Sequence, residues 1–154
     1  MSDHMIMELE EIVIPNGATI NSLAFAANCV SSQEELHYFS DKYFEMTARG
    51  PRDLSLLSFM SKKTSDDVQA FAEGIGCGMG LLEDLLVVSA HPQYRDLQRE
   101  GAIIALGSSI LVKDWTNIPA LSEWDRDRSL YLSSHTTGVW PEMFRFLLVR
   151  KDSN

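Results

Sequence analysis

The histidine and cysteine residues are among the side chains of this chain that could bind a metal ion or attack a substrate. The chain has four histidines and two cysteines: His4, His37, His91, His135, Cys29 and Cys77. Zinc sites use these residue types at short spacings such as C-x-x-C, and no such spacing occurs here. The sequence therefore disfavours a metal site and predicts that both cysteines are buried free thiols. A His–Cys catalytic pair assembled by folding stays open as an alternative.

Motifs for acid–base or nucleophilic catalysis are few. His135 begins an H-x-T motif, which occurs twice in two-histidine phosphoesterases, where the histidines act as acid and base on a phosphate. A second copy is missing, so a loop histidine is the better interpretation. There is no G-x-S-x-G motif, and the acidic groups around Glu8 and Asp125 are expected to face solvent. The sequence offers no convincing active site.

Glycines occupy alternate positions from Gly74 to Gly80, in the segment GIGCGMG. Each glycine weakens a helix or strand by about 0.5–1 kcal/mol relative to alanine, so the segment needs a backbone reason. The spacing does not fit G-x-G-x-x-G, because Met79 stands where the last glycine would be, and no lysine follows as in a Walker motif. Close backbone packing or a hairpin-like turn is favoured over a phosphate-binding loop.

A short apolar run, DLLVV (84–88), precedes HPQYR (91–95) and REGA (99–102), and LYLSSHTTG follows at 130–138. This pattern resembles the central motif of the GNAT superfamily of acetyltransferases, in which a strand is followed by a turn and a helix. In that family, the backbone N–H groups of the turn and the helix N-terminus hold the pyrophosphate of acetyl-coenzyme A. The resemblance implies a cofactor site at His91, Tyr94, Arg95 and Gly101.

The charge of the chain is concentrated near its N-terminus. The chain has 13 Lys and Arg residues against 22 Asp and Glu residues, a formal net charge of -9. Residues 1–41 hold seven acidic residues and no Lys or Arg, which leaves only -2 for residues 42–154. Nucleic acid is an improbable ligand for such a chain, whereas a basic protein partner is a candidate. The candidate contact residues are Glu8, Glu10, Glu11, Glu34 and Glu35, and a merely solvated acidic face is the alternative.

Aromatic and arginine residues mark a second candidate surface. The three tryptophans, Trp115, Trp124 and Trp140, lie in the last 40 residues with arginines between them. Tryptophan and arginine are enriched at interface hot spots, which makes Trp124, Arg126 and Trp140 candidate contact residues. Packing in the core is the favoured interpretation of the tryptophans.

The elements that must position these residues are first predicted for the N-terminal half. Alternating apolar residues favour a strand over 7–14 that ends at the turn 15–17. A helix is expected over 21–30. A capping box at Ser31 and Glu34 predicts a second helix, which carries Leu36, Phe39, Tyr43 and Met46 on one stripe and ends at Gly50 and Pro51. A short helix from Pro51 to Met60 and a helix capped by Thr64, with Val68 and Phe71 facing inward, complete this half.

In the C-terminal half, the apolar run 85–88 suits a buried strand. A long helix is expected from Pro92 to Val112, with its second half buried because residues 102–112 are almost continuously apolar. A strand begins at 130–132, and the last structured segment runs from Trp140 to Val149.

The length and composition favour one domain over residues 1–154. With 45% hydrophobic residues, a chain of 154 residues can bury one core. The expected class is α+β or α/β, with several helices on a small mixed sheet, and a GNAT-like fold is one possibility. No apolar run is long enough to span a bilayer and the N-terminus lacks a basic leader, so a soluble, cytoplasmic protein is expected.

The leading functional hypothesis is a small acidic protein that binds a partner protein without a cofactor, as an inhibitor, adaptor or assembly factor. A homodimer is possible through the apolar residues between Leu54 and Met60. The alternative is a GNAT-like acyltransferase that binds acetyl-coenzyme A.

Overall fold

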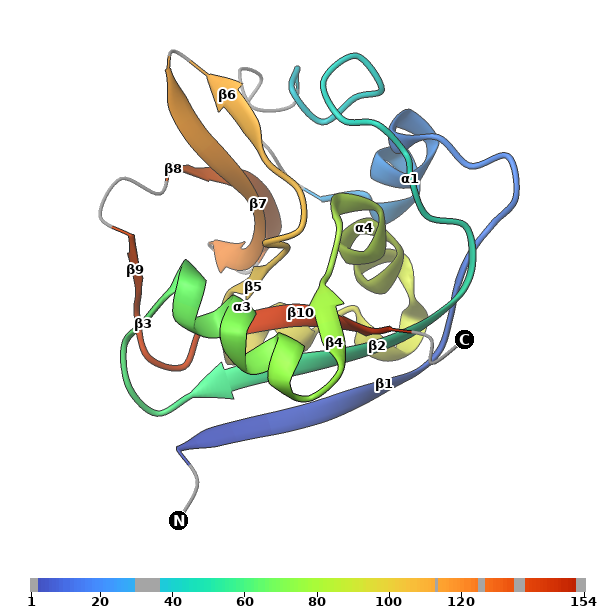
Figure 1. Ribbon diagram of the computed structural model, residues 1–154. Coiled ribbons are helices and arrows are strands. Elements are labelled where there is room, and N and C mark those ends of the chain that lie inside the picture. Colours follow the sequence, from blue (N-terminus) through green and yellow to red (C-terminus); the bar gives the residue numbers. More distant parts are fainter. Residues whose placement is uncertain (1–2, 30–36, 113, 125–126, 135–137, 152–154) are drawn as a thin grey trace.

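A computed structural model defines the fold and describes residues 3–29, 37–112, 114–124, 127–134 and 138–151, without the side chains of Glu11 and Trp124. Eight strands of this part form one sheet, in the order β1-β2-β10-β5-β7-β6, with β4 beside β10 and β8 beside β7 (Figure 1). The strands are β1 (His4–Ile14), β2 (Gly50–Phe59), β4 (Cys77–Met79), β5 (Ile103–Ile104), β6 (Ile110–Val112), β7 (Trp115–Trp124), β8 (Asp127–Ser134) and β10 (Arg145–Arg150). The strand predicted over 7–14 is thus confirmed, as is the one that begins at 130–132.

The sheet is mixed, because β10 runs parallel to β5 while the other strand pairs between described residues are antiparallel. A second sheet pairs β3 (Lys63–Thr64) with β9 (Val139–Trp140). The class is therefore α+β, and the main sheet is larger than the small one expected from the sequence. Strand β1 lies at one end of the sheet, so one of its sides has no neighbouring described strand.

Helices cover both faces of this sheet. Helices α1 (Ile20–Ala27) and α4 (Leu82–Ala90) pack on one face and α3 (Ser65–Gly74) on the other. Adjacent residues of the central strands contribute to opposite clusters, since Leu56 joins the core under α1 and α4 and Leu57 the core under α3. A strand buried on both faces has a nearly continuous apolar sequence, which explains why residues 54–59 belong to β2 and not to the predicted short helix.

Local capping explains the helices that the sequence predicted correctly. Thr64 and Asp67 form a capping box at the start of α3, whose Val68 and Ala72 are buried. Thr19 caps α1, and the Asp41 carboxylate accepts hydrogen bonds from the N–H groups of Ile20 and Asn21 at 2.8 and 3.2 Å.

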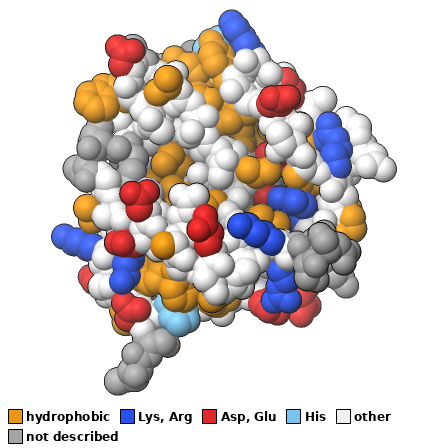
Figure 2. Space-filling model, in the orientation of Figure 1, with side chains coloured by type: hydrophobic (Ala, Val, Ile, Leu, Met, Phe, Trp, Pro, Cys, Tyr) orange, Lys and Arg blue, Asp and Glu red, His pale blue; other side chains and the backbone are white. Residues whose placement is uncertain are grey.

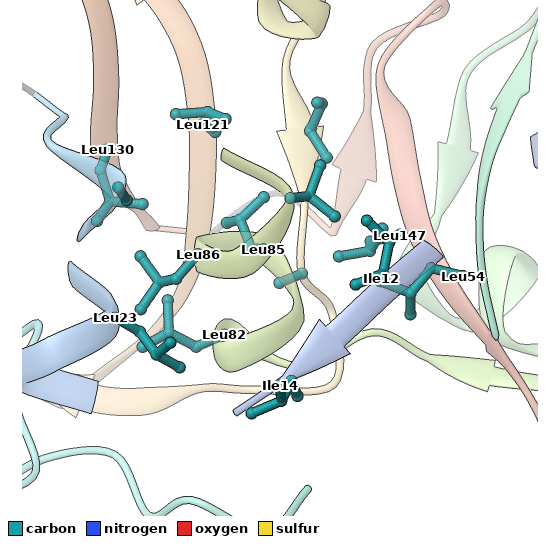
Figure 3. Close-up of a cluster of buried hydrophobic side chains, with 14 of the residues drawn as sticks. Ile12, Ile14, Leu23, Leu54, Leu82, Leu85, Leu86, Leu121, Leu130 and Leu147 are labelled. Carbon is teal, nitrogen blue, oxygen red and sulfur yellow. The ribbon is translucent and has the colours of Figure 1, made fainter. Parts of the chain in front are cut away.

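The apolar run at 85–88 is helical, so the predicted strand is wrong. Helix α4 begins where the Asp84 carboxylate accepts hydrogen bonds from the N–H of Leu81 and from Nε and Nη2 of Arg52. Its apolar residues are continuous because α4 is buried on most sides: Figure 3 shows Leu82, Leu85 and Leu86 among side chains of β1, β2, α1, β7, β8 and β10. Periodicity alone does not separate such a helix from a buried strand.

Two further predicted helices are wrong in the described residues. Residues 37–43 form turns and 44–49 are irregular, while the capping box at Ser31 and Glu34 lies outside the described residues. The expected helix from Pro92 to Val112 is replaced by two 3-10 turns (Pro92–Tyr94 and Leu97–Glu100) followed by β5 and β6. The predicted burial is confirmed only for residues 102–105, where Ile103 and Ile104 are fully buried as sheet residues, whereas Leu111 of β6 is 75% exposed.

The glycine-rich segment is a site of close backbone packing, as favoured from the sequence. Gly76 makes the turn from α3 into β4 with a positive φ of 80°. A Cβ atom on Gly80 would lie 2.7 Å from Leu147, and Gly80 N–H donates to the Leu147 carbonyl. Among the helices that the structure describes, none is long and apolar enough to cross a membrane.

Candidate functional site

The outer side of β1 is an open strand edge with exposed apolar side chains. Within the described ranges β1 pairs only with β2. Its side chains Met5, Ile6 and Met7 are 57%, 44% and 43% exposed. Successive side chains of a strand point to opposite faces, so apolar surface is exposed on both faces of this edge. An apolar strand edge of this kind is a template for pairing with another strand.

The hydrogen-bond pattern shows which backbone groups of β1 face outward. The N–H of Met60 donates to the carbonyl of Asp3 at 2.8 Å, so the backbone groups of Asp3 face β2. Along an antiparallel strand, residues alternate between bonding the neighbour and facing away from it. The backbone groups of Met5 and Met7 therefore bond to β2, and those of His4, Ile6 and Glu8 face the open side.

A hydrogen bond to a tyrosine side chain, made at a β-bulge, ends this open stretch. The pairing of β1 with β2 shifts between Leu9 and Ile12, and the N–H of Glu10 donates to the hydroxyl of Tyr94 at 2.6 Å. Tyr94 is buried, so its side chain holds the first 3-10 turn against β1. The open edge consequently runs only from His4 to Glu8.

A small hollow borders the open edge on the face that α3 covers. Its volume is about 210 Å³, and its lining includes Ile6, Glu8, Ile75, Cys77 and Arg150. The Arg150 guanidinium lies 3.6 Å from the Glu8 carboxylate and also pairs with Asp53. Figure 2 shows hydrophobic side chains gathered at the lower margin of this face, with acidic and basic side chains beside them.

The N-terminal acidic residues are less free than the sequence suggested. The Asp41 carboxylate accepts backbone hydrogen bonds at the start of α1. Asp3 lies 3.3 Å from the Lys63 ammonium group, and the hydrogen bond from Lys63 lowers the pKa of Asp3. Glu8 has Arg150 nearby, whereas Glu10 is exposed. The side chain of Glu11 and the residues Glu34 and Glu35 lie outside what the structure describes.

The residues that the GNAT resemblance assigned to acetyl-coenzyme A do not form the expected cradle. The position of the family's strand is taken by α4, and no described α-helix begins at Pro92. His91 Nδ1 accepts the N–H of Gln93, Tyr94 bonds to β1, and Arg95 is exposed. Gly101 is required for packing, because a Cβ at its φ of 147° would lie 3.1 Å from the Met143 carbonyl.

The core interpretation of the tryptophans holds only in part, since of the two with described side chains Trp140 is buried and Trp115 is exposed. Trp140, a candidate contact residue, is buried, and its Nε1–H donates to the Ser65 hydroxyl at 2.8 Å, so its proposed role at a surface is wrong. The side chain of Trp124 and the whole of Arg126 lie outside the described residues. Trp115 is 56% exposed beside β6, which sequence reasoning missed because exposure of a β7 residue depends on where the sheet ends.

Both cysteines are free thiols, as predicted, but only Cys77 is buried as expected, whereas Cys29 is half-buried. Cys29 Sγ lies 3.0 Å from the Ser89 hydroxyl, which also accepts a hydrogen bond from Arg128. Burial raises the pKa of the Cys29 thiol, the opposite of what activates a nucleophile. The described residues contain no group of three or more potential metal ligands, and His135 is outside them.

Comparisons with protein-family models, with curated proteins and with solved structures found no match to this chain.

Proposed function

We propose that this protein binds a partner protein by accepting an extended segment of that partner as an additional strand beside β1. The observation that supports the proposal is the open edge from His4 to Glu8, where three outward-facing backbone units combine with exposed apolar side chains on both faces. In strand addition, main-chain hydrogen bonds provide affinity and the flanking side chains provide selectivity. No cofactor takes part in this binding. A protein that binds in this way could serve as an inhibitor, adaptor or assembly factor.

The surroundings of the edge indicate the chemistry of the added segment. Apolar side chains of the segment would pack against Met5 and Met7 on one face and against Ile6 and Ile75 on the other. At the end near the bulge, the exposed carboxylates of Glu8 and Glu10 favour a basic residue. The proposed segment is therefore extended, mainly apolar and basic toward one end.

The proposal is tested by comparing two substitutions at one position. Ile6→Pro removes an outward-facing N–H, and proline is tolerated on an edge strand when that N–H points away from the sheet. Ile6→Thr shortens the apolar side chain but keeps the N–H. Proteins captured by the wild-type chain and by Ile6→Thr, but lost with Ile6→Pro, are the expected partners. Identical capture by all three chains would overturn the proposal.

Charge reversal tests the acidic end separately. Glu8→Lys combined with Glu10→Lys and Glu11→Lys is expected to weaken capture of the same partner, because a basic residue would then face like charge. The melting temperature should change little, since Glu8 and Glu10 are exposed. Capture that is unaffected by this triple reversal contradicts a basic partner segment but not strand addition itself.

A further inference from the structure

The open edge of β1 is complementary to itself. Its outward-facing residues, His4, Ile6 and Glu8, are evenly spaced about Ile6, and the bonded N–H of Glu10 closes the edge beyond them. Two copies related by a twofold axis at Ile6 therefore satisfy each other's N–H and carbonyl groups as three hydrogen-bonded residue pairs. No outward-facing group between His4 and Glu8 is left over.

We propose that a second copy of this chain occupies this edge in antiparallel register, with Ile6 of each copy opposite Ile6 of the other. This inference rests on the proposed function, because it uses the same edge. In this register Met5 faces Met7 of the second copy, so apolar side chains meet across the strands. His4 faces Glu8 of the second copy at both ends, where a histidine and a carboxylate are complementary.

Neighbouring registers fit less well. Pairing centred on Met5 sets Ile6 opposite His4 of the second copy, so Glu8 no longer faces a histidine. Pairing centred on Met7 sets Glu8 opposite Ile6 and His4 opposite Glu10, whose N–H already donates to Tyr94. The register centred on Ile6 is the one that combines complete backbone pairing with complementary side chains.

The self-paired form covers the surface to which the partner segment is proposed to bind. A partner must then displace the second copy, so its apparent affinity falls as the concentration of this chain rises. Self-pairing also protects an apolar edge that would otherwise favour aggregation. The second copy thus acts as a competitor that regulates access to β1.

Light scattering after size-exclusion chromatography tests the pairing. The mass of the wild-type chain is expected to rise from 17.3 kDa toward twice that value between low-micromolar and near-millimolar concentration. Ile6→Pro should stay at 17.3 kDa over the same range, and Ile6→Thr should still dimerise. A wild-type chain that stays monomeric throughout, or an Ile6→Pro chain that dimerises like the wild type, overturns the inference.

A charge exchange tests the register and does not depend on proline. His4→Glu alone sets two carboxylates opposite one another at both ends of a homodimer, and Glu8→Lys alone removes the carboxylate that faces His4. Each variant should therefore dimerise more weakly than the wild type. In an equimolar mixture, the introduced glutamate faces the introduced lysine at one end and native Glu8 faces native His4 at the other. Heterodimers should therefore form in preference to either homodimer. A mixture without this preference refutes the register.

These results separate the inference from the proposed function. A monomeric wild-type chain whose partner is still lost with Ile6→Pro rejects self-pairing and supports strand addition. A dimer that Ile6→Pro abolishes, with unchanged partner capture, supports self-pairing and rejects β1 as the partner site.

Discussion

The buried ion pair between Arg52 and Asp84 should be a main determinant of stability. Asp84 is fully buried, and it accepts hydrogen bonds from Arg52 Nε at 2.7 Å, from Arg52 Nη2 at 3.0 Å and from Leu81 N–H at 2.9 Å. Asp84→Asn keeps the shape of the side chain but leaves the Arg52 guanidinium without its counterion. Breaking a buried pair in this way costs about 3–5 kcal/mol. We expect Asp84→Asn to lower the free energy of unfolding by about 2–4 kcal/mol, because Arg52 retains some contact with water and the asparagine can still accept the hydrogen bond from the Leu81 N–H.

For a chain of this size, that loss lowers the melting temperature by about 4–16 °C. Urea unfolding followed by circular dichroism measures the free energy of unfolding. Asp66→Asn is the matched control, because it also removes a carboxylate from the first turn of a helix but from an exposed position, at a cost of about 0.3–1 kcal/mol. The double variant with Arg52→Met should recover part of the loss, since no guanidinium is then left unpaired. The reasoning would be refuted if Asp84→Asn lost no more stability than Asp66→Asn. It would also be refuted if the loss in the double variant equalled the sum of the losses in Asp84→Asn and Arg52→Met.

Three further predictions concern backbone geometry and the cofactor. Met7→Pro removes an N–H that bonds β2, so it should lower the free energy of unfolding by about 1–3 kcal/mol, whereas Ile6→Pro should change it much less, as urea titration would reveal. Gly80→Ala should destabilise by about 1–3 kcal/mol because its Cβ would overlap Leu147, while Gly78→Ala, where the nearest atom is 3.6 Å away, should be close to neutral in the same assay. Acetyl-coenzyme A should leave the melting temperature unchanged in a thermal-shift assay, whereas a ligand at 100 times its dissociation constant adds about 2.7 kcal/mol of stability.

The parts of the fold that were predictable depend on short-range signals. The capping residue Thr64 and the alternating residues of β1 specify their structure locally, and both elements are present. The runs at 82–90 and 102–105 could not be interpreted in this way, because burial on most sides removes the amphipathic pattern that distinguishes a helix from a strand. The stripe from Phe39 to Met46 had helical spacing, yet residues 37–49 are turns and irregular chain.

The candidate site was only partly predictable, for a related reason. The segment that contains Glu8 and Glu10 was identified from its charge, whereas the structure draws attention to the apolar residues Met5 to Met7 beside it. Whether a strand lies at an edge depends on pairing between distant segments, and no local pattern encodes it. The sequence likewise suggested that Tyr94 binds a cofactor, whereas its hydroxyl accepts a hydrogen bond from Glu10, which lies 84 positions away in the chain.

The hydrogen bond between Tyr94 and Glu10 limits the length of the open edge, because it occupies the next backbone N–H group that could bond a second strand. Removing only that oxygen, in Tyr94→Phe, would free the Glu10 N–H and extend the open stretch to a fourth outward-facing residue. The centre of symmetry would then no longer be unique, because pairing about Met7 would become as complete as pairing about Ile6. One hydroxyl group therefore separates a chain that pairs in a single register from one whose copies can associate in several.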